Sequence, residues 1–172
     1  MTPSTAGQAV NDLHFIQLTD GSYTVIDAED QQLARAYRWM RHHTGSGNYY
    51  AANTTAPRTG RVYLHRLVMG EPASHVDHIS RDKMVNCKAN LRACTCAQNL
   101  SNRGKTAMNT SGYKGVDWVK RISTWRAQIG VRGARLFLGH FTDPVAAARA
   151  YDAAARRLHG EFALTNFPEE TT

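Results

Sequence analysis

The sequence predicts an α+β protein made of two domains, residues 1–106 and residues 107–172. Three observations predict this class. Segments that alternate apolar and polar residues occur in both halves and indicate strands. One long alanine-rich segment, residues 142–160, has the start and stop signals of a helix. Between the halves, GKTAMNTSG (residues 104–112) is small, polar and without periodicity, which is typical of a linker.

The composition allows a packed core and favours an anionic partner. Of the 172 residues, 42% are hydrophobic, so wholesale disorder is not expected. The net charge is +7, with −1 in residues 1–60, +5 in residues 61–111 and +3 in residues 112–172. The basic excess therefore lies after Gly60. It favours nucleic acid as the partner, although a solvated basic surface gives the same count.

The chain carries no sign of a membrane or of secretion. No hydrophobic run approaches the length of a membrane span. The start, MTPSTAGQAVNDLHF, lacks the basic region followed by an apolar region of a signal peptide. We expect a cytoplasmic protein that has no membrane partner and is not secreted.

Three cysteines, Cys87, Cys94 and Cys96, cannot all pair with one another. They could hold zinc, but the chain has no CxxC knuckle. Ordinary semi-buried thiols are the favoured interpretation.

The first domain begins with a hairpin signal. FIQLTDGSYTVID alternates around Asp20-Gly21, a dipeptide that is typical of tight hairpin turns. Residues 33–40 fit either a short helix or an extended segment, and the RHH that follows is interpreted as an exposed polar stretch. HTGSGNYYAAN and RVYLHRLVM indicate two more strands, the second passing into a helix. Thr95 and Gln98 form a capping box, which predicts a helix that starts near Cys96.

The second domain is predicted to be a three-stranded antiparallel sheet with one helix across its back. YKGVDWVK, TWRAQIGV and ARLFLGHF alternate, and the last two meet at Arg132-Gly133. The helix has Thr142 and Asp143 at its cap, Pro144 in its first turn and Gly160 as its stop. The residues that we expect on its buried face are Ala147, Ala148, Tyr151, Ala155 and Leu158.

Alternation assigns the two faces of this sheet. We expect Ala127 and Ile129 to point to the helix, together with Leu136 and Leu138. The residues that we expect on the outward face are Arg126, Gln128, Arg135 and Phe137. A charged solvent face on a small sheet is the alternative without function.

The first domain resembles the HNH endonucleases of phages and introns. The resemblance rests on Asp77-His78, on Asn90 twelve residues after the histidine and on Asn99 nine residues further, in the variant whose last position is Asn. The flanking LHRLVMG and NLRACTCAQN are also similar to this family. The resemblance implies a ββα-metal fold for a core of about residues 60–106.

This resemblance also implies the chemistry. Asp77 and the amide oxygen of Asn99 would hold one Mg²⁺ or Mn²⁺ ion, and the ion would neutralise charge on the scissile phosphate and on the leaving oxygen. His78 would take the proton from water, because an imidazole can stay neutral at physiological pH. Asn90 would pin the loop and help to orient His78. Arg92 is a candidate phosphate contact. A solvated Asp-His turn next to an Asn-rich helix start is the alternative without chemistry.

The second domain resembles the AP2/ERF DNA-binding domain of plant transcription factors, through SGYKGVDWVK, TWRAQI and LFLGHFTDPVAAARAYDAAARRLHGEFALTNFP. By this resemblance, Lys114, Gln128, Arg135 and Phe137 match DNA-contacting positions. Arginine is usual where this chain has Asp117, Val119 and Gly130, so the plant target sequence does not transfer. A β-ribbon of this kind can enter the major groove of DNA, so we also expect the outward-facing Arg126 to contact DNA.

Taken together, the two resemblances imply a homing-type endonuclease that nicks or cuts double-stranded DNA and is targeted by an AP2 domain. We expect it to act as a monomer, in the cytoplasm of a bacterial host if it is encoded by a phage. A DNA-binding regulator whose nuclease half has decayed is the first alternative, and a repair or restriction-like nuclease is the second.

Overall fold

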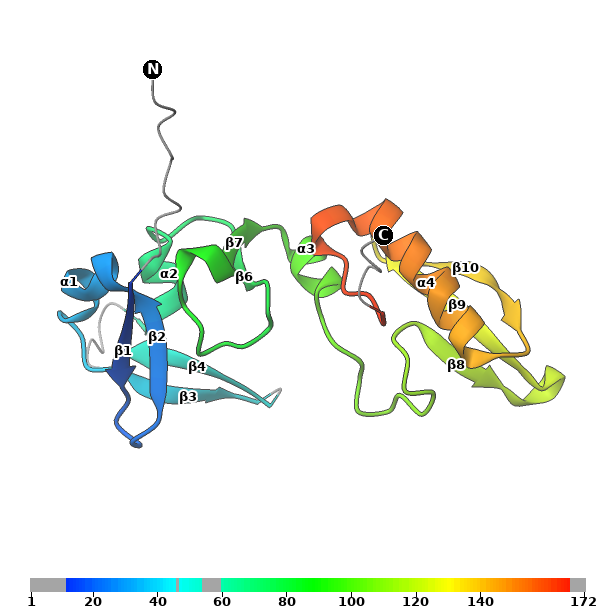
Figure 1. Cartoon of the computed structure of the whole chain (residues 1–172), viewed down its shortest axis with the longest axis horizontal. Coiled ribbons are helices and arrows are strands. Elements are labelled where there is room, and N and C mark those ends of the chain that lie inside the picture. Colours follow the sequence, from blue (N-terminus) through cyan, green and yellow to red (C-terminus); the bar gives the residue numbers. More distant parts are fainter. Residues whose placement is uncertain (1–11, 46, 54–59, 168–172) are drawn as a thin grey trace, which may run out of the picture. The chain divides into compact units, whose positions relative to one another are not determined.

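The computed structural model describes residues 12–45, 47–53 and 60–167, and its contacts divide the chain into two compact units, Met1–Ala93 and Cys94–Thr172. Figure 1 shows several small sheets and few helices. The α+β class is confirmed in this coarse form. The division falls thirteen residues before the boundary that the linker predicts, because the short helix after Thr95 packs with the second unit. None of the helices in the described ranges combines the length and the hydrophobicity that a membrane span needs.

In its described residues, the first unit contains three small sheets. Its elements are β1 (Leu13–Gln17), β2 (Tyr23–Asp27), α1 (Gln31–Ala34), β3 (Met40–Thr44), β4 (Asn48–Asn53), β5 (Val62–Tyr63), α2 (Leu64–Val68), β6 (His75–His78) and β7 (Leu91–Cys94), which ends just across the division. Strands β1 and β2 form the predicted antiparallel hairpin, and β3, β4 and β5 form a three-stranded sheet. The RHH segment is part of β3, where Arg41 and His43 are exposed and His42 is half-buried.

An apolar core ties these pieces together. Ile26 of the hairpin, Trp39, Ala51 of β4, Leu64 of α2 and Leu91 of β7 all belong to one buried cluster. The hairpin therefore shares a core with the segments that carry the candidate site. Strand β6, whose Val76 belongs to the same cluster, is fixed against this core.

The second unit begins with α3 (Cys96–Ser101) and continues with the predicted sheet and helix. The sheet consists of β8 (Val116–Val119), β9 (Thr124–Val131) and β10 (Ala134–Phe141), with β9 in the middle and antiparallel pairing throughout. The turn between β9 and β10 uses Arg132 and Gly133 with φ of 48° and 82°, which is the left-handed backbone that tight hairpins need. Residues 104–112 contain no regular element, in agreement with the sequence.

Helix α4 (Pro144–His159) packs on one face of this sheet. Asp143 caps it by accepting hydrogen bonds from the backbone N–H groups of Val145 and Ala146, and Gly160 ends it, as predicted. Its buried face consists of Ala147, Ala148, Tyr151, Asp152, Ala154 and Ala155. Leu158 was wrongly expected there: it lies in the last turn and is 38% exposed. The small alanine side chains let the helix approach Ala127 and Ile129 of β9 closely.

One inward position on β10 was also predicted wrongly. Leu136 pairs with the buried Ile129, yet its side chain is 45% exposed. The reason is that β10 is an edge strand, and the α4 residues that cover Ile129 leave Leu136 at the margin of the sheet. A bulge between Phe137 and Gly139 then turns Leu138 into both apolar clusters of the unit.

Candidate active site and DNA-facing sheet

Asp77 and His78 lie side by side in β6 and are both buried. Their exposed fractions are 1% and 0%. Burial at this level does not fit a solvated turn. An ionisable pair in such a place needs polar partners to offset its desolvation, and the partners of each residue show what it can do.

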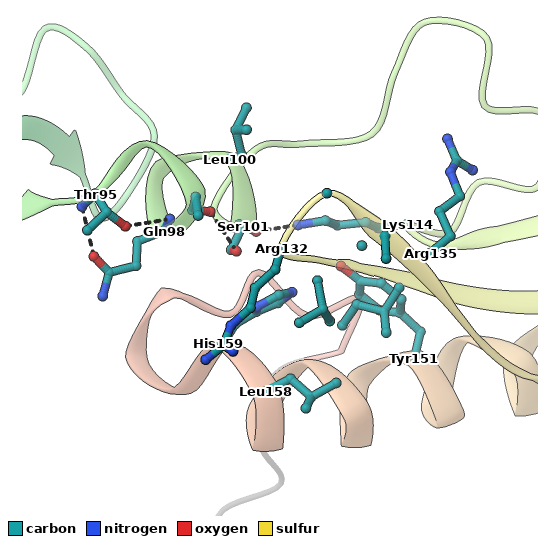
Figure 2. Close-up of a pocket in the computed structure, with 16 residues that line it drawn as sticks. Thr95, Gln98, Leu100, Ser101, Lys114, Arg132, Arg135, Tyr151, Leu158 and His159 are labelled. Carbon is teal, nitrogen blue, oxygen red and sulfur yellow. Dashed lines mark hydrogen bonds between the residues drawn. The ribbon is translucent and has the colours of Figure 1, made fainter.

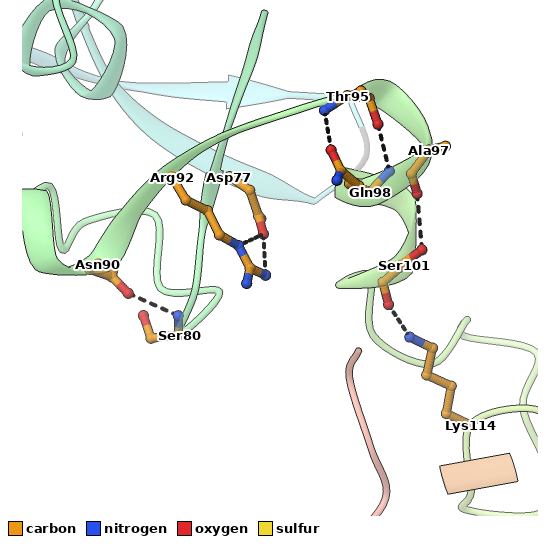
Figure 3. Close-up of polar contacts among 9 residues, drawn as sticks. All are labelled: Asp77, Ser80, Asn90, Arg92, Thr95, Ala97, Gln98, Ser101 and Lys114. Atoms are coloured by element: carbon orange, nitrogen blue, oxygen red, sulfur yellow. Dashed lines mark hydrogen bonds and ion pairs between the residues drawn. The ribbon is translucent and has the colours of Figure 1, made fainter. Parts of the chain in front are cut away.

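Asp77 is held by Arg92 of the neighbouring strand β7. The Asp77 Oδ2 atom accepts hydrogen bonds from Arg92 Nε at 3.1 Å and from Nη2 at 2.8 Å (Figure 3). The Arg92 side chain is 13% exposed, so this is a largely buried ion pair. The guanidinium neutralises the carboxylate in this structure. The predicted contact between Arg92 and a phosphate stays a prediction.

His78 is held by Asn86, which the sequence analysis did not select. The His78 Nε2 atom lies 3.0 Å from Asn86 Oδ1. The amide nitrogen of Asn86 donates to Thr24 Oγ1 at 2.7 Å, and Thr24 Oγ1 donates to the Met84 carbonyl at 2.7 Å. Because the amide nitrogen is engaged with Thr24, the amide oxygen faces the imidazole and accepts from Nε2–H. The proton of the neutral ring is thereby placed on Nε2, which leaves Nδ1 as the basic nitrogen.

The N-terminal hairpin supports this arrangement. Thr24 belongs to β2, and the next residue, Val25, exchanges backbone hydrogen bonds with the loop before β7: Val25 N–H donates to the Met84 carbonyl at 3.0 Å, and Asn86 N–H donates to the Val25 carbonyl at 2.7 Å. Asp27 then accepts from the Lys88 backbone N–H at 2.7 Å. The hairpin thus fixes the loop that orients His78, which gives a structural role to a region whose pattern alone indicated none.

Burial keeps the imidazole of His78 neutral. It lowers the pKa of His78 from 6.5 to about 4, against the opposing effect of the hydrogen bond to Asn86. His65 of α2 lies against it, with ring centroids 5.1 Å apart, and burial together with the charge of His78 lowers the pKa of His65 to about 3. Both rings are therefore uncharged near neutral pH, which is the state in which an imidazole can accept a proton.

Asn90 pins the loop between β6 and β7. Its amide oxygen accepts from the Ser80 backbone N–H at 2.9 Å, and its amide nitrogen donates to the Val85 carbonyl at 2.7 Å (Figure 3). These contacts join the two ends of the loop, and the predicted role of Asn90 in catalysis stays a prediction. The orienting contact to His78 comes from Asn86.

Asn99, the predicted second metal ligand, lies on α3 in the second unit and is half-buried. The helix starts with the predicted capping box, in which Thr95 and Gln98 each accept a hydrogen bond from the other's backbone N–H (Figure 3). This cap fixes the first turn of the helix, which carries Asn99. Its role as a ligand stays a prediction.

The donor chemistry of Asp77 fits a hard divalent ion, because a carboxylate oxygen is the ligand that Mg²⁺ and Mn²⁺ prefer. Two observations qualify the fit. Arg92 engages the same carboxylate, so an ion and the guanidinium would compete for it. Across the described ranges, no group of three or more His, Cys, Asp or Glu side chains could hold a metal ion. An ion at Asp77 would therefore rely on amide, water or phosphate oxygens for its other ligands.

The outward face of the second unit's sheet carries a three-residue cluster. Arg126 of β9 pairs with Asp117 of β8, with Nε to Oδ1 at 3.2 Å and Nη2 to Oδ2 at 2.7 Å. Gln128 donates from Nε2 to the same Asp117 Oδ1 at 3.0 Å. Two predicted DNA contacts thus converge on an acid that the sequence analysis noted only as a departure from the plant pattern.

Arg135 and Phe137 of β10 continue this face. Both are exposed, and Phe137 pairs with Gln128 across the strands. The Phe137 ring lies 5.0 Å from that of His140, between centroids. The structure thus brings together on one face four of the residues predicted from alternation, namely Arg126, Gln128, Arg135 and Phe137.

Lys114 lies instead in a hollow of about 650 Å³ between α3, α4 and the end of β9 and β10. Figure 2 shows its ammonium reaching the Ser101 carbonyl, at 2.5 Å. The ammonium also lies 5.9 Å from the centre of the Tyr151 ring. DNA would compete with these contacts, and the predicted contact of Lys114 with DNA stays a prediction. Arg132 and Arg135 also line the hollow, and their charges make it basic (Figure 2).

Local sequence patterns did not indicate the contact between Thr24 and Asn86, because these two residues are distant in sequence. Thr24 and Asn86 are 62 residues apart. An asparagine in an Asx-rich loop is usually a turn residue, so only its burial, at 1% exposure, distinguishes Asn86.

Comparisons with known proteins give similarity to both predicted families. No protein-family model matches the chain. It is 53% identical over 62 residues to an AP2/ERF and B3 domain-containing protein of Oryza sativa subsp. japonica, across 36% of this chain and 17% of that protein. It is 40% identical over 89 residues to an AP2-like ethylene-responsive transcription factor of Arabidopsis thaliana, across 45% of this chain and 21% of that protein.

A third similarity covers most of the chain. The chain is 27% identical over 155 residues to an uncharacterised HNH endonuclease of Acanthamoeba polyphaga mimivirus, across 85% of this chain and 75% of that protein. The chain thus spans about a fifth of the length of the plant relatives and three quarters of the viral one. It is similar to AP2/ERF proteins over a short stretch and, at lower identity, to an HNH endonuclease over most of its length.

Proposed function

We propose that this protein is a metal-dependent endonuclease that nicks or cuts double-stranded DNA and is directed to its target by the sheet of its second unit. The observation that carries the proposal is the buried, neutral His78, which follows the buried Asp77 in β6 and is fixed in one tautomer by Asn86. A neutral imidazole held in one orientation can accept the proton of an attacking water.

In this proposal His78 is the general base. The Nε2–H group of His78 keeps its hydrogen bond to the amide oxygen of Asn86. The proton of the attacking water therefore goes to Nδ1 of His78. Asn86 then also stabilises the imidazolium that forms, because its amide oxygen continues to accept from Nε2–H. Asn90 holds the loop between β6 and β7 through Ser80 and Val85.

Asp77 is the proposed ligand in the first unit, and Asn99 is the proposed ligand from α3. When bound, Mg²⁺ or Mn²⁺ supplies charge neutralisation at the scissile phosphate and at the leaving oxygen. Arg92 would release Asp77 as the ion binds, and its guanidinium would then be available to a DNA phosphate.

The sheet of the second unit is the proposed targeting surface. Arg126, Gln128, Arg135 and Phe137 lie on the face opposite α4, and the region after residue 60 holds the basic excess. The similarity to AP2/ERF proteins supports DNA as the partner.

A second candidate function is that of a DNA-binding regulator without nuclease activity. The observation that favours it is the ion pair between Arg92 and Asp77, which gives the carboxylate a cationic partner in place of a metal ion. One of the similar proteins is named as an AP2-like transcription factor. Both candidates share the targeting sheet and differ only in chemistry.

A cleavage assay separates the two candidates. The full chain is incubated with supercoiled plasmid and with phage DNA, in Mg²⁺, in Mn²⁺ and in EDTA, and any break is mapped by sequencing the ends. We expect metal-dependent nicks or cuts that His78→Ala abolishes. Binding of DNA without cleavage in either metal, by protein that is folded, would support the regulator and contradict the endonuclease.

The targeting sheet has its own test. Arg135→Ala should weaken DNA binding without changing the metal requirement of cleavage. Arg157→Ala is a matched control. Arg157 is exposed on α4, so this variant loses the same charge at a position outside the sheet face. Equal DNA affinity of the two variants would contradict the assignment of this face.

A further inference from the structure

Asp117 of the edge strand β8 lies on the outward face of the sheet, next to Arg126 and Gln128 of the central strand β9. It is paired across the strands with Arg126, and both of its oxygens accept from that guanidinium. One of the two also accepts from Gln128. A single acid thus fixes the positions of the two side chains on β9 that face the proposed DNA partner.

Stability does not explain this cluster. The side chains of Asp117 and Arg126 are 41% and 39% exposed, and ion pairs at such exposure add little to the free energy of unfolding. The cluster also has an electrostatic cost for DNA binding. A carboxylate on this face repels phosphates and cancels the charge of the arginine beside it.

The hydrogen-bonding chemistry of the Asp117 carboxylate suggests that it contributes to the sequence specificity of DNA binding. Ionised Asp only accepts hydrogen bonds, and in the major groove of DNA the amino group of cytosine is the donor that acidic side chains recognise. An acid of this kind suppresses binding to sites that offer only acceptors at its position, which is how a repulsive group creates specificity.

We propose that Asp117 is a specificity-determining residue of the sheet. It holds Arg126 and Gln128 in one geometry, it weakens binding to DNA in general, and it favours targets that present a cytosine amino group to it. This inference rests on the proposed function, since it requires that the sheet binds DNA.

The test compares Asp117→Asn with the wild type and with a control, Glu161→Gln, in the full chain. The amide that Asp117→Asn introduces would keep one acceptor for Arg126 and Gln128 while removing the charge. Glu161 is an exposed acid in the same unit, outside the sheet, so its variant makes the same change of net charge elsewhere. Circular dichroism confirms that each variant is folded.

Two measurements report the outcome. The first is fluorescence anisotropy with a labelled duplex of random sequence over a series of KCl concentrations. Asp117→Asn should bind about tenfold more tightly, with a salt slope steeper by about 0.9, as for one additional phosphate contact. The second is selection of duplexes from a randomised pool followed by sequencing. The variant should lose a cytosine preference at one position that the wild type and Glu161→Gln retain.

The possible failures are distinguishable. If the wild type binds and selects duplexes but Asp117→Asn matches Glu161→Gln in affinity, slope and selected sequences, the role of Asp117 is overturned and the proposed function stands. Weaker binding of Asp117→Asn to every duplex overturns it as well, because the acid would then only support its neighbours. If no folded form of the protein binds any duplex at low salt, the targeting function fails and this inference falls with it.

Discussion

The amide oxygen of Asn86 lies 3.0 Å from Nε2 of His78, in the buried interior of the first unit. The contact determines which ring nitrogen carries the proton, because the amide nitrogen of Asn86 is engaged by Thr24. The residue that orients the candidate base is therefore itself oriented by the N-terminal hairpin.

Asn86→Ala should lower the rate of cleavage and leave the affinity for DNA unchanged, because Asn86 acts through His78. Combining it with His78→Ala tests this route. If the two residues act as a unit, the double variant is no slower than His78→Ala alone. The measurement is a double-mutant cycle. Single-turnover cleavage rates and DNA affinities are determined for the wild type, both single variants and the double variant. Additive losses would show that Asn86 acts by another route.

His78→Ala should reduce cleavage about 10²–10⁴-fold, the usual cost of losing a general base. DNA binding should stay near that of the wild type. His75→Ala is the control, because His75 lies in the same strand with its side chain exposed. A His78→Ala protein that cleaves as fast as His75→Ala would remove His78 from the mechanism.

Asp77→Ala and Asn99→Ala should each raise the concentration of Mg²⁺ that half-maximal cleavage needs, because each removes a proposed ligand. Turnover at saturating metal should also be slower. The measurement is a metal titration of the cleavage rate, with EDTA-treated protein as the starting point. Titrations that overlay that of the wild type would show that the ligand roles are wrong.

Arg92→Gln should strengthen the binding of Mn²⁺ in the absence of DNA, because the guanidinium no longer competes for the carboxylate of Asp77. Titration calorimetry with Mn²⁺ measures this directly, without relying on activity. Asp77→Ala is the matched control and should bind Mn²⁺ less tightly than the wild type. Equal affinity of Arg92→Gln and the wild type would mean that the ion pair and the ion do not share the carboxylate.

Gly115→Ala should destabilise the second unit far more than Gly112→Ala. Both glycines have left-handed backbones, with φ of 76° and 78°, and either substitution costs about 1–2 kcal/mol for that reason. A Cβ on Gly115 would also overlap the Tyr151 ring and lie 2.8 Å from the Gln128 carbonyl oxygen, whereas one on Gly112 would meet no atom within 4 Å. The overlap should add about 1–3 kcal/mol. Urea unfolding of both variants measures the difference, and equal losses would contradict the close packing of α4 on the sheet.

The metal-free first unit should lose stability as the pH falls below about 6.5. His65 and His78 have folded-state pKa values lowered to about 3 and about 4 from an ordinary value of 6.5, so the unfolded chain binds protons in this window that the folded chain does not. The free energy of unfolding should therefore fall by about 1.4 kcal/mol per pH unit for each imidazole. Urea unfolding in EDTA, at a series of pH values from about 7.5 to about 5, measures the slope. His140→Ala should keep it, because His140 is exposed, and a stability that is constant over this window would contradict the burial of the two rings.

The features that depend on local patterns were predictable from the amino-acid sequence. Asp20-Gly21 and Arg132-Gly133 marked the two hairpins, since a left-handed turn needs particular residues. Thr95 with Gln98, and Asp143 with Pro144 and Gly160, marked the limits of two helices, because capping involves groups only a few residues apart. Alternation on β9 assigned Ala127 and Ile129 to the core and Arg126 and Gln128 to the outer face.

The contacts that each of these side chains makes depend on how the strands and helices pack, and local patterns did not predict them. Leu136 and Leu158 follow the apolar pattern but lie at the margins of the packed surface, where the alanine-rich helix no longer covers them. Thr24 reaches Asn86 because the hairpin shares a core with β6 and β7, and Asp117 reaches Arg126 and Gln128 because β8 pairs with β9 in one register. A periodic pattern fixes the direction of a side chain relative to its own backbone. Its partner across the chain depends on how the strands and helices pack, and no local pattern contains that information.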